Sequence, residues 1–193
     1  MLNINRISIL LFTSFLTMGC SNKNDAFMPS KKQTETFLQK NNLDDTYLLN
    51  EELFENPIMI TDYSPIVDKN PTIIKSKEEF LNYEPEIYKQ DNYYEEFNYK
   101  EFKNISLEKF DDYNLVISSD LMSGYAAFDY IFKNLFLKNN KLIFHYYYDN
   151  YLPEGVAVNC VCGNTAYLTF IKKTVEFTEI QEIIEKATDY TDN

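Results

Sequence analysis

Glycine, histidine, cysteine and tryptophan are scarce or missing in this 193-residue chain, and each shortage narrows the chemistry open to it. Only four glycines occur, and neither a phosphate-binding loop nor a dinucleotide fingerprint is present. His145 is the single histidine, and no third ligand accompanies the neighbouring cysteines Cys160 and Cys162. We therefore expect no metal site and no cofactor.

The chain is acidic, with a formal net charge of −12. Negative charge at this level repels nucleic acid at long range, so no DNA or RNA partner is expected. Apolar residues make up 45% of the chain, which favours a globular protein over a disordered one.

Residues 1–19 have the layout of a secretory signal peptide. Arg6 gives a basic start, Ile7 to Met18 form a mostly apolar run, and Gly19 and Cys20 follow at once. Twelve residues at about 1.5 Å each give a helix of roughly 18 Å, whereas the hydrocarbon core of a bilayer is about 30 Å thick. The segment is therefore expected to be a cleaved signal helix and not a membrane span.

The stretch Leu16 to Cys20 (LTMGC) resembles the lipobox of bacterial lipoproteins, in which the cysteine thiol is acylated and becomes the first mature residue. Thr17 stands where leucine is usual, and Leu16 is one place early. The resemblance implies fatty chains such as palmitate on Cys20. Each buried methylene contributes about 0.8 kcal/mol, so two or more chains anchor a protein stably. Ser21, in place of aspartate, favours the outer membrane of a bacterial envelope.

The part after the signal divides into a tether and a domain. Residues 20–33 are polar and without periodicity, which is typical of a flexible tether. Residues 34–193 suffice for a single domain, since a chain of about 150 residues buries roughly 70% of its unfolded surface.

The domain is expected to be α+β. Short β-branched and aromatic runs between turn signals predict a mainly antiparallel sheet at about 105–177, either sandwich-like or a half-barrel. Asn139 and Asn140 separate two such runs, and asparagine tolerates positive φ, so a tight hairpin turn is expected there. Alternation in the returning strand predicts one face formed by Leu142, Phe144, Tyr146 and Tyr148, and another formed by Ile143, His145 and Tyr147.

Two flanking helices are expected beside this sheet. Ser76 precedes Glu79 by the spacing of a capping box, which predicts a helix near 76–84 that Pro85 ends. Thr178 and Gln181 repeat this spacing. A closing helix at 178–187 is therefore expected, with one apolar face formed by Ile180, Ile183, Ile184 and Ala187.

The order of these motifs resembles a known family. The capped helix at Lys75–Phe80 is followed by Phe110–Val116, by a turn at Ser123–Tyr125, by a hairpin and by Cys162–Lys173. Over about residues 73–173 this is similar to the C-terminal domain of the protease complex subunit PrcB family, small bacterial lipoproteins with a mostly β domain. Ser123 and Ala166 depart from the glycine and proline usual in that family. The resemblance implies a protein that assists or stabilises a partner.

Cys160 and Cys162 form a candidate disulfide, because exported proteins fold in an oxidising compartment. In a regular strand, the Cα atoms of such residues are about 7 Å apart with parallel side chains, which is at the outer limit for a bridge. A disulfide here therefore needs a bulge or turn, which Gly163 permits. Two buried thiols on one strand face are the alternative.

His145 is the most specific candidate for a catalytic base. A hydrolase would combine it with Ser118, Ser119 or Ser123 and with Asp120, but no G-x-S-x-G context accompanies these residues. A lone histidine in a strand is more often an outward polar residue. We therefore expect His145 to face solvent, and we expect no catalytic site.

Together these observations predict a membrane-anchored envelope lipoprotein that binds a protein partner or an extracellular ligand. Two alternatives remain from other classes. One is a hydrolase using His145, and the other is an immunity or inhibitor lipoprotein that blocks a toxin or a protease.

Overall fold

The computed structural model describes residues 28–62, 70–83, 104–119, 121–123, 130–150 and 163–190. The predicted signal peptide, Cys20, Asp120, Cys160 and Cys162 lie outside the described residues. Lipidation of Cys20 and the Cys160–Cys162 disulfide therefore stay predictions.

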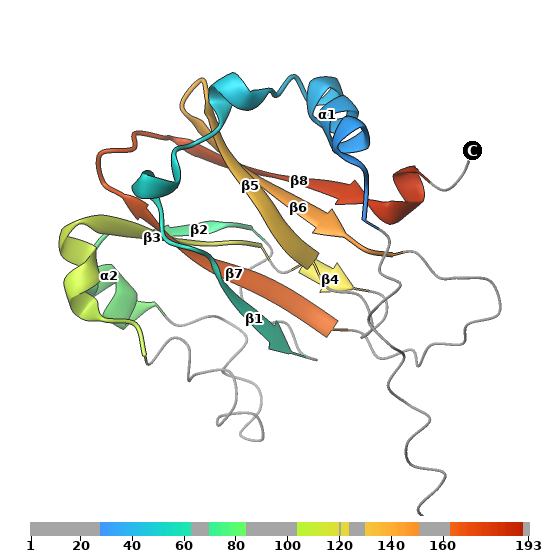
Figure 1. Cartoon of the computed structure of the whole chain (residues 1–193). Helices are drawn as coiled ribbons and strands as arrows, with labels where there is room; N and C mark the ends of the chain where they lie inside the picture. Colours follow the sequence, from blue (N-terminus) through green and yellow to red (C-terminus); the bar gives the residue numbers. More distant parts are fainter. Residues whose placement is uncertain are drawn as a thin grey trace, which may run out of the picture.

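Two β-sheets that pack face to face form an α+β fold with mainly antiparallel strands (Figure 1). Sheet A has the strand order β5-β6-β8 and consists of β5 (Tyr130–Lys138), β6 (Lys141–Tyr148) and β8 (Glu179–Lys186). Sheet B has the order β1-β7-β3-β2, with β4 also paired to β7. Its strands are β1 (Ile58–Asp62), β2 (Thr72–Ile74), β3 (Tyr113–Ile117), β4 (Leu121–Ser123) and β7 (Gly163–Lys172).

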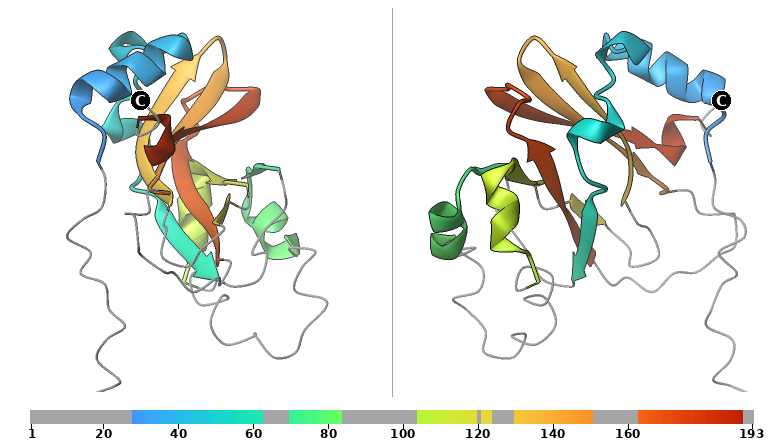
Figure 2. Two further views of the ribbon diagram at one scale, coloured as in Figure 1. Left: turned by 90° about the vertical axis from the view of Figure 1, so that its right-hand side faces the viewer. Right: turned by 60° about the vertical axis from the view of Figure 1, so that its left-hand side comes forward.

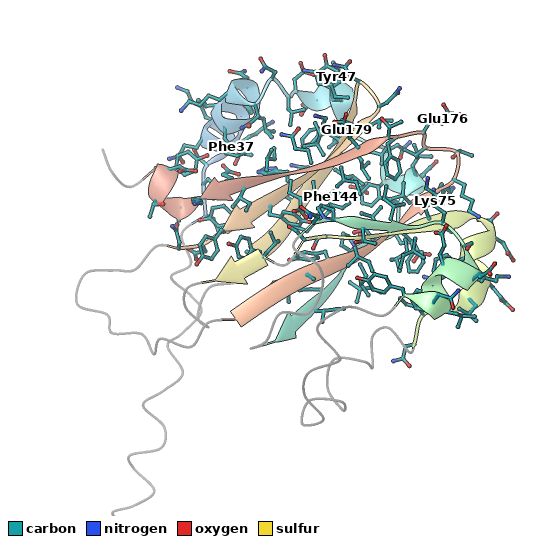
Figure 3. All side chains as sticks on the ribbon, turned by 180° about the vertical axis from the view of Figure 1, so that it is seen from behind. Phe37, Tyr47, Lys75, Phe144, Glu176 and Glu179 are labelled. Carbon is teal, nitrogen blue, oxygen red and sulfur yellow. The ribbon has the colours of Figure 1, made fainter. Side chains whose placement is uncertain are left out.

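The main hydrophobic core lies between the two sheets. Phe144 and Tyr146 of β6 meet Val116 of β3 and Ile171 of β7 there, and Phe144 is labelled in Figure 3. The predicted alternation along β6 is confirmed, because its even-numbered apolar residues belong to this core whereas Ile143 belongs to a cluster on the other face. Both faces of β6 are thus buried, and it forms the centre of sheet A.

Helices cover the outer faces of both sheets, which gives the layer order helix, sheet, sheet, helix (Figures 1 and 2). On sheet A, Leu38 of α1 (Lys31–Lys40) packs with Ile143 and Ile183. On sheet B lie α2 (Lys77–Asn82) and the 3-10 helix η5 (Leu107–Asp111), where the rings of Phe80 and Phe110 are 5.2 Å apart. None of the helices in the described ranges is long and apolar enough to cross a membrane.

Local capping explains where α1 and α2 begin. Ser76 Oγ accepts a hydrogen bond from the Glu79 amide at 3.0 Å, which confirms the predicted helix start. The Glu79 carboxylate reaches back to the amide of Lys75, one residue before the cap. A complete capping box, formed by Ser30 and Gln33, starts α1 at Lys31, so this helix includes the last three residues of the expected tether.

Three short 3-10 helices complete the described elements: η2 (Asp45–Tyr47), η3 (Glu51–Leu53) and η6 (Ala187–Asp189). The first two lie in the connection between α1 and β1. Along this connection Leu49 N–H donates to the Leu135 carbonyl at 2.8 Å, which covers part of the outer edge of β5.

The predicted hairpin turn is confirmed. Asn139 and Asn140 have φ values of 52° and 59°, and they connect β5 to β6 at the pair Lys138 and Lys141. Two successive left-handed residues match the right-handed twist of the paired strands, as in a type I′ turn.

The predicted closing helix is wrong, because the segment forms strand β8, parallel to β6 from Glu179 to Lys186. Its isoleucines are β-branched and suit a strand as well as a helical face. A helix this short is marginally stable on its own in water. Pairing with β6 over eight residues instead adds the segment to an existing sheet. Strands β1, β2 and β8 also extend the sheets beyond the expected limits of 105–177.

Replacing Asn139 tests the turn. Asn139→Ala is expected to lower the free energy of unfolding by about 1 kcal/mol, because alanine adopts positive φ less readily than asparagine. Asn139→Gly is the matched control and is expected to change it by less than about 0.5 kcal/mol. Urea unfolding followed by circular dichroism measures both; equal losses in the two variants would contradict the type I′ assignment.

Candidate functional sites

His145 lies on the outer face of sheet A beneath α1, with none of its side chain exposed. The ring of Phe37, labelled on α1 in Figure 3, stacks on the imidazole with ring centroids 5.5 Å apart and planes 20° apart. The expectation that His145 faces solvent is wrong, because α1 covers this face of β6. Sequence alternation alone does not show such a cover.

A β-bulge in β5 brings a second polar group to the imidazole. The pairing of β5 with β6 shifts between Phe132 and Asn134, so Asn134 stands opposite His145. Bulges re-aim side chains in this way. Asn134 Nδ2 lies 3.3 Å from His145 Nδ1. An amide nitrogen can only donate, so in this orientation Nδ1 accepts and the neutral ring carries its proton on Nε2.

Glu185 of β8 occupies the other side of the ring, and its carboxylate is fully buried. His145 Nε2 donates to Glu185 Oε2 at 3.0 Å, and Oε1 accepts from Thr34 Oγ1 at 3.0 Å and from the Tyr190 hydroxyl at 2.5 Å. Burial by itself raises the pKa of this carboxyl. The hydrogen bonds from His145, Tyr190 and Thr34 outweigh burial and hold the pKa below its ordinary value.

This cluster joins four parts of the chain. Thr34 belongs to α1, His145 to β6, Glu185 to β8, and Tyr190 follows η6. The Tyr190 hydroxyl also lies 3.4 Å from the carbonyl oxygen of Gln33, and the pKa of this hydroxyl is raised by burial and by its bond to Glu185. The arrangement fixes the N-terminal helix and Tyr190 onto one sheet, and its His145 and Glu185 side chains have no solvent exposure.

A second polar cluster lies on the opposite, inner face of sheet A. The register against β7 shifts by one residue between β3 and β4, like that of a bulge, because Ile117 pairs with Leu168 and Leu121 with Thr165. At this shift, Ser118 Oγ takes the place of a backbone acceptor and accepts a hydrogen bond from the Tyr167 amide at 2.8 Å. The next residue, Ser119, is thereby turned toward the other sheet.

Ser119 bridges the two sheets through Glu182 of β8. Its amide donates to Glu182 Oε1 at 3.0 Å, and its hydroxyl bonds to Oε2. Burial raises the pKa of the Glu182 carboxyl, and the bonds from Ser119 reduce this shift without abolishing it. Burial raises the pKa of the neighbouring Tyr146 hydroxyl, the Glu182 charge raises it further, and the Ser118 side chain lowers it in part.

Among the described residues of the alternative hydrolase site, His145 does not lie beside Ser118 or Ser119. His145 faces α1, whereas Ser119 contacts Glu182 on the other face of sheet A. The Ser118 side chain is buried and accepts a hydrogen bond from Tyr167 of sheet B. Asp120 and the side chain of Ser123 lie outside the described residues. Within the described ranges no three His, Cys, Asp or Glu residues are grouped so that they could hold a metal ion.

The chain was compared with protein-family models, curated proteins and solved structures, and none of the three comparisons found a match. The resemblance to the PrcB family therefore stays a prediction.

The contacts of Glu182 and Glu185 could not be predicted from the residues around them. In the expected closing helix, both would have been solvent-facing residues opposite the isoleucines. The one signal available was the single histidine in an apolar strand, since a buried imidazole needs a polar partner from elsewhere in the chain.

Removing the imidazole is expected to destabilise the fold strongly. His145→Leu leaves the Glu185 carboxylate buried without one of its donors and should lower the free energy of unfolding by about 3 kcal/mol. The double variant with Glu185→Met should recover part of this loss, because it removes the buried charge as well. Urea unfolding of the wild type, both single variants and the double variant measures the coupling; purely additive losses would contradict the pair.

The same carboxylate predicts a pH dependence of stability. Because the folded-state pKa of Glu185 is lowered, its contribution is present above the unfolded value of about 4.3 and is lost as pH falls through the folded value. Glu182, with a raised pKa, acts with the opposite sign: its contribution is present at low pH and is lost as pH rises through the folded value. The two contributions can be separated by measuring urea midpoints between about pH 3 and pH 7. The proteins compared are the unsubstituted chain, Glu185→Gln and Glu182→Gln. Glu185→Gln should flatten the acid loss and Glu182→Gln should steepen it; the reverse order would refute the assignment.

Proposed function

We propose that this chain is a bacterial envelope lipoprotein, anchored through lipid on Cys20, whose folded part binds a protein partner and does not catalyse a reaction. The observation that supports binding without catalysis is the burial of the His145 imidazole. Both ring nitrogens are occupied by protein groups, and the ring is buried beneath Phe37.

The anchor is supported by the sequence Leu16 to Cys20 and by the position at which α1 begins. Lys31, the first residue of α1, follows Cys20 by eleven residues. A fully extended chain spans at most about 3.6 Å per residue, so the start of α1 lies within about 40 Å of the lipid. A partner of the folded part is therefore met close to the membrane surface.

Binding without catalysis is supported by how the polar side chains are used. A general base must reach the proton that it abstracts, either directly or through one water. His145 and Glu185 are fully buried, and their hydrogen bonds fix α1 and the C-terminal residues to sheet A. Ser119 and Glu182 likewise hold one sheet to the other. These groups stabilise the fold, and the exposed surface is left for contact with a partner.

Metabolic labelling tests the anchor. The full chain, made in a bacterial host supplied with an alkyne-tagged palmitate, is expected to carry the label and to sediment with membranes. Cys20→Ser should lose the label because the acylated sulfur is gone. The double variant Cys160→Ser/Cys162→Ser is the matched control and should keep it. A label that survives Cys20→Ser, or an unlabelled wild-type chain in the soluble fraction, would refute the anchor.

Purification of the intact lipoprotein from cross-linked membranes tests the partner. One envelope protein should be recovered in comparable amount with the wild-type chain and with His145→Gln, since binding does not require imidazole chemistry. Recovery of no protein above the level of an unrelated lipoprotein would contradict the proposal. A substrate that is turned over by the wild-type chain and not by a folded His145→Gln variant would favour the hydrolase.

A further inference from the structure

A hollow of about 270 Å³ lies at one end of the molecule, where the two sheets come together. Its walls come from the end of β2, from the tip of the β5–β6 hairpin and from the connection between β7 and β8, residues 173–178. Ligand pockets usually measure about 300–1000 Å³. The hollow is therefore at the small end of the range and fits a ligand the size of one amino acid.

The base of the hollow is apolar. Val175 is only 6% exposed, and Ile73 and Phe177 are half-buried. An apolar group of a ligand can rest on these side chains and lose contact with water, which is the main source of affinity in most pockets.

Four polar side chains around the hollow have no hydrogen-bond or ion-pair partner within the described part of the chain: Lys75, Asn114, Asn140 and Glu176. Figure 3 shows Lys75 and Glu176 at the same end of the molecule; Lys75 lies between β2 and α2, and Glu176 lies between β7 and β8. The adjacent charges Lys141 and Glu179, by contrast, pair with each other at 3.0 Å. Among the described residues, the hollow thus presents one unpaired cation and one unpaired anion on exposed residues, with two amides that bind no other side chain.

The backbone around the hollow is held in place before any ligand arrives. The Lys173 amide donates to the Asp112 carbonyl at 2.9 Å, and its ammonium donates to the Phe110 carbonyl at 2.6 Å. At the other side, the Thr178 amide donates to the Asn140 carbonyl at 2.8 Å. A preorganised rim reduces the entropy lost on binding.

We propose that this hollow binds a free α-amino acid with an apolar side chain of about the size of leucine. Lys75 pairs with the ligand carboxylate and Glu176 with its ammonium group. The amides of Asn114 and Asn140 donate to the carboxylate, and the apolar side chain lies on Val175 and Phe177. A zwitterion satisfies both unpaired charges, whereas an anion alone leaves Glu176 unpaired and meets the repulsion of a chain of net charge −12. The inference goes beyond partner binding and does not depend on the lipid anchor.

Titration of the ¹⁵N-labelled full chain in detergent micelles with L-leucine tests the site by amide chemical shifts. Saturable shifts are expected at Lys75, Asn140 and Glu176 at up to about 10 mM leucine, tenfold above a dissociation constant of about 1 mM. L-Leucinamide lacks the carboxylate and 4-methylpentanoate lacks the ammonium group. Each should bind at least about tenfold more weakly than leucine. No saturable shift, or an analogue that binds as tightly as leucine, would overturn the proposal.

Three variants locate the interaction. Lys75→Gln and Glu176→Gln should each weaken leucine binding about tenfold, because each removes one charge-assisted contact. Lys141→Gln is the matched control: it removes a neighbouring cation that is already paired with Glu179, and it should leave leucine binding unchanged. The amide spectrum of each variant reports its fold in the same experiment. Wild-type affinity in both Lys75→Gln and Glu176→Gln would refute the site.

Discussion

A carboxylate without solvent contact, that of Glu185, is the constraint around which sheet A and its covering helix are arranged. An ionised group in this position is tolerated only when donors surround it. The three donors come from α1, from β6 and from the residue that follows η6. Displacement of any one of these elements would leave a buried charge short of a hydrogen bond. The cluster therefore makes the docking of α1 and of the C-terminal residues mutually dependent.

Strand β8 is held by polar contacts on both of its faces. Glu185 points toward α1, and Glu182 points toward the other sheet, where Ser119 binds it. Each contact depends on a local shift in strand register. A bulge in β5 places Asn134 beside His145, and a one-residue shift between β3 and β4 lets Ser119 face the other sheet. Bulges re-aim single side chains without changing the strand order. Two local irregularities thus position the partners of Glu185, which is buried, and of Glu182, which is half-buried.

The features that could be predicted from the sequence are those encoded by neighbouring residues. The start of α2 follows from Ser76 and Glu79, the hairpin from Asn139 and Asn140, and the two faces of β6 from simple alternation. The α+β class with mainly antiparallel strands follows from the same patterns.

The features that could not be predicted depend on residues far apart in the chain. The segment 179–186 carries a capping-box spacing before it and an isoleucine pattern compatible with a helix, yet pairing with β6 makes it a strand. His145 has no local sign of burial, since its cover, α1, lies more than 100 residues earlier. Glu182 and Ser119 are 63 residues apart in the sequence. Their contact also depends on a register shift at Ser119 that no glycine, proline or asparagine in the sequence marks.

The parallel pairing of β8 with β6 also sets the order in which the molecule can be completed. β8 is the last strand in the sequence, and Tyr190 beyond it closes onto the N-terminal helix. During synthesis β5 and β6 leave the ribosome before β8, so sheet A gains its third strand, and α1 its contact with Tyr190, only after the β5–β6 hairpin is available.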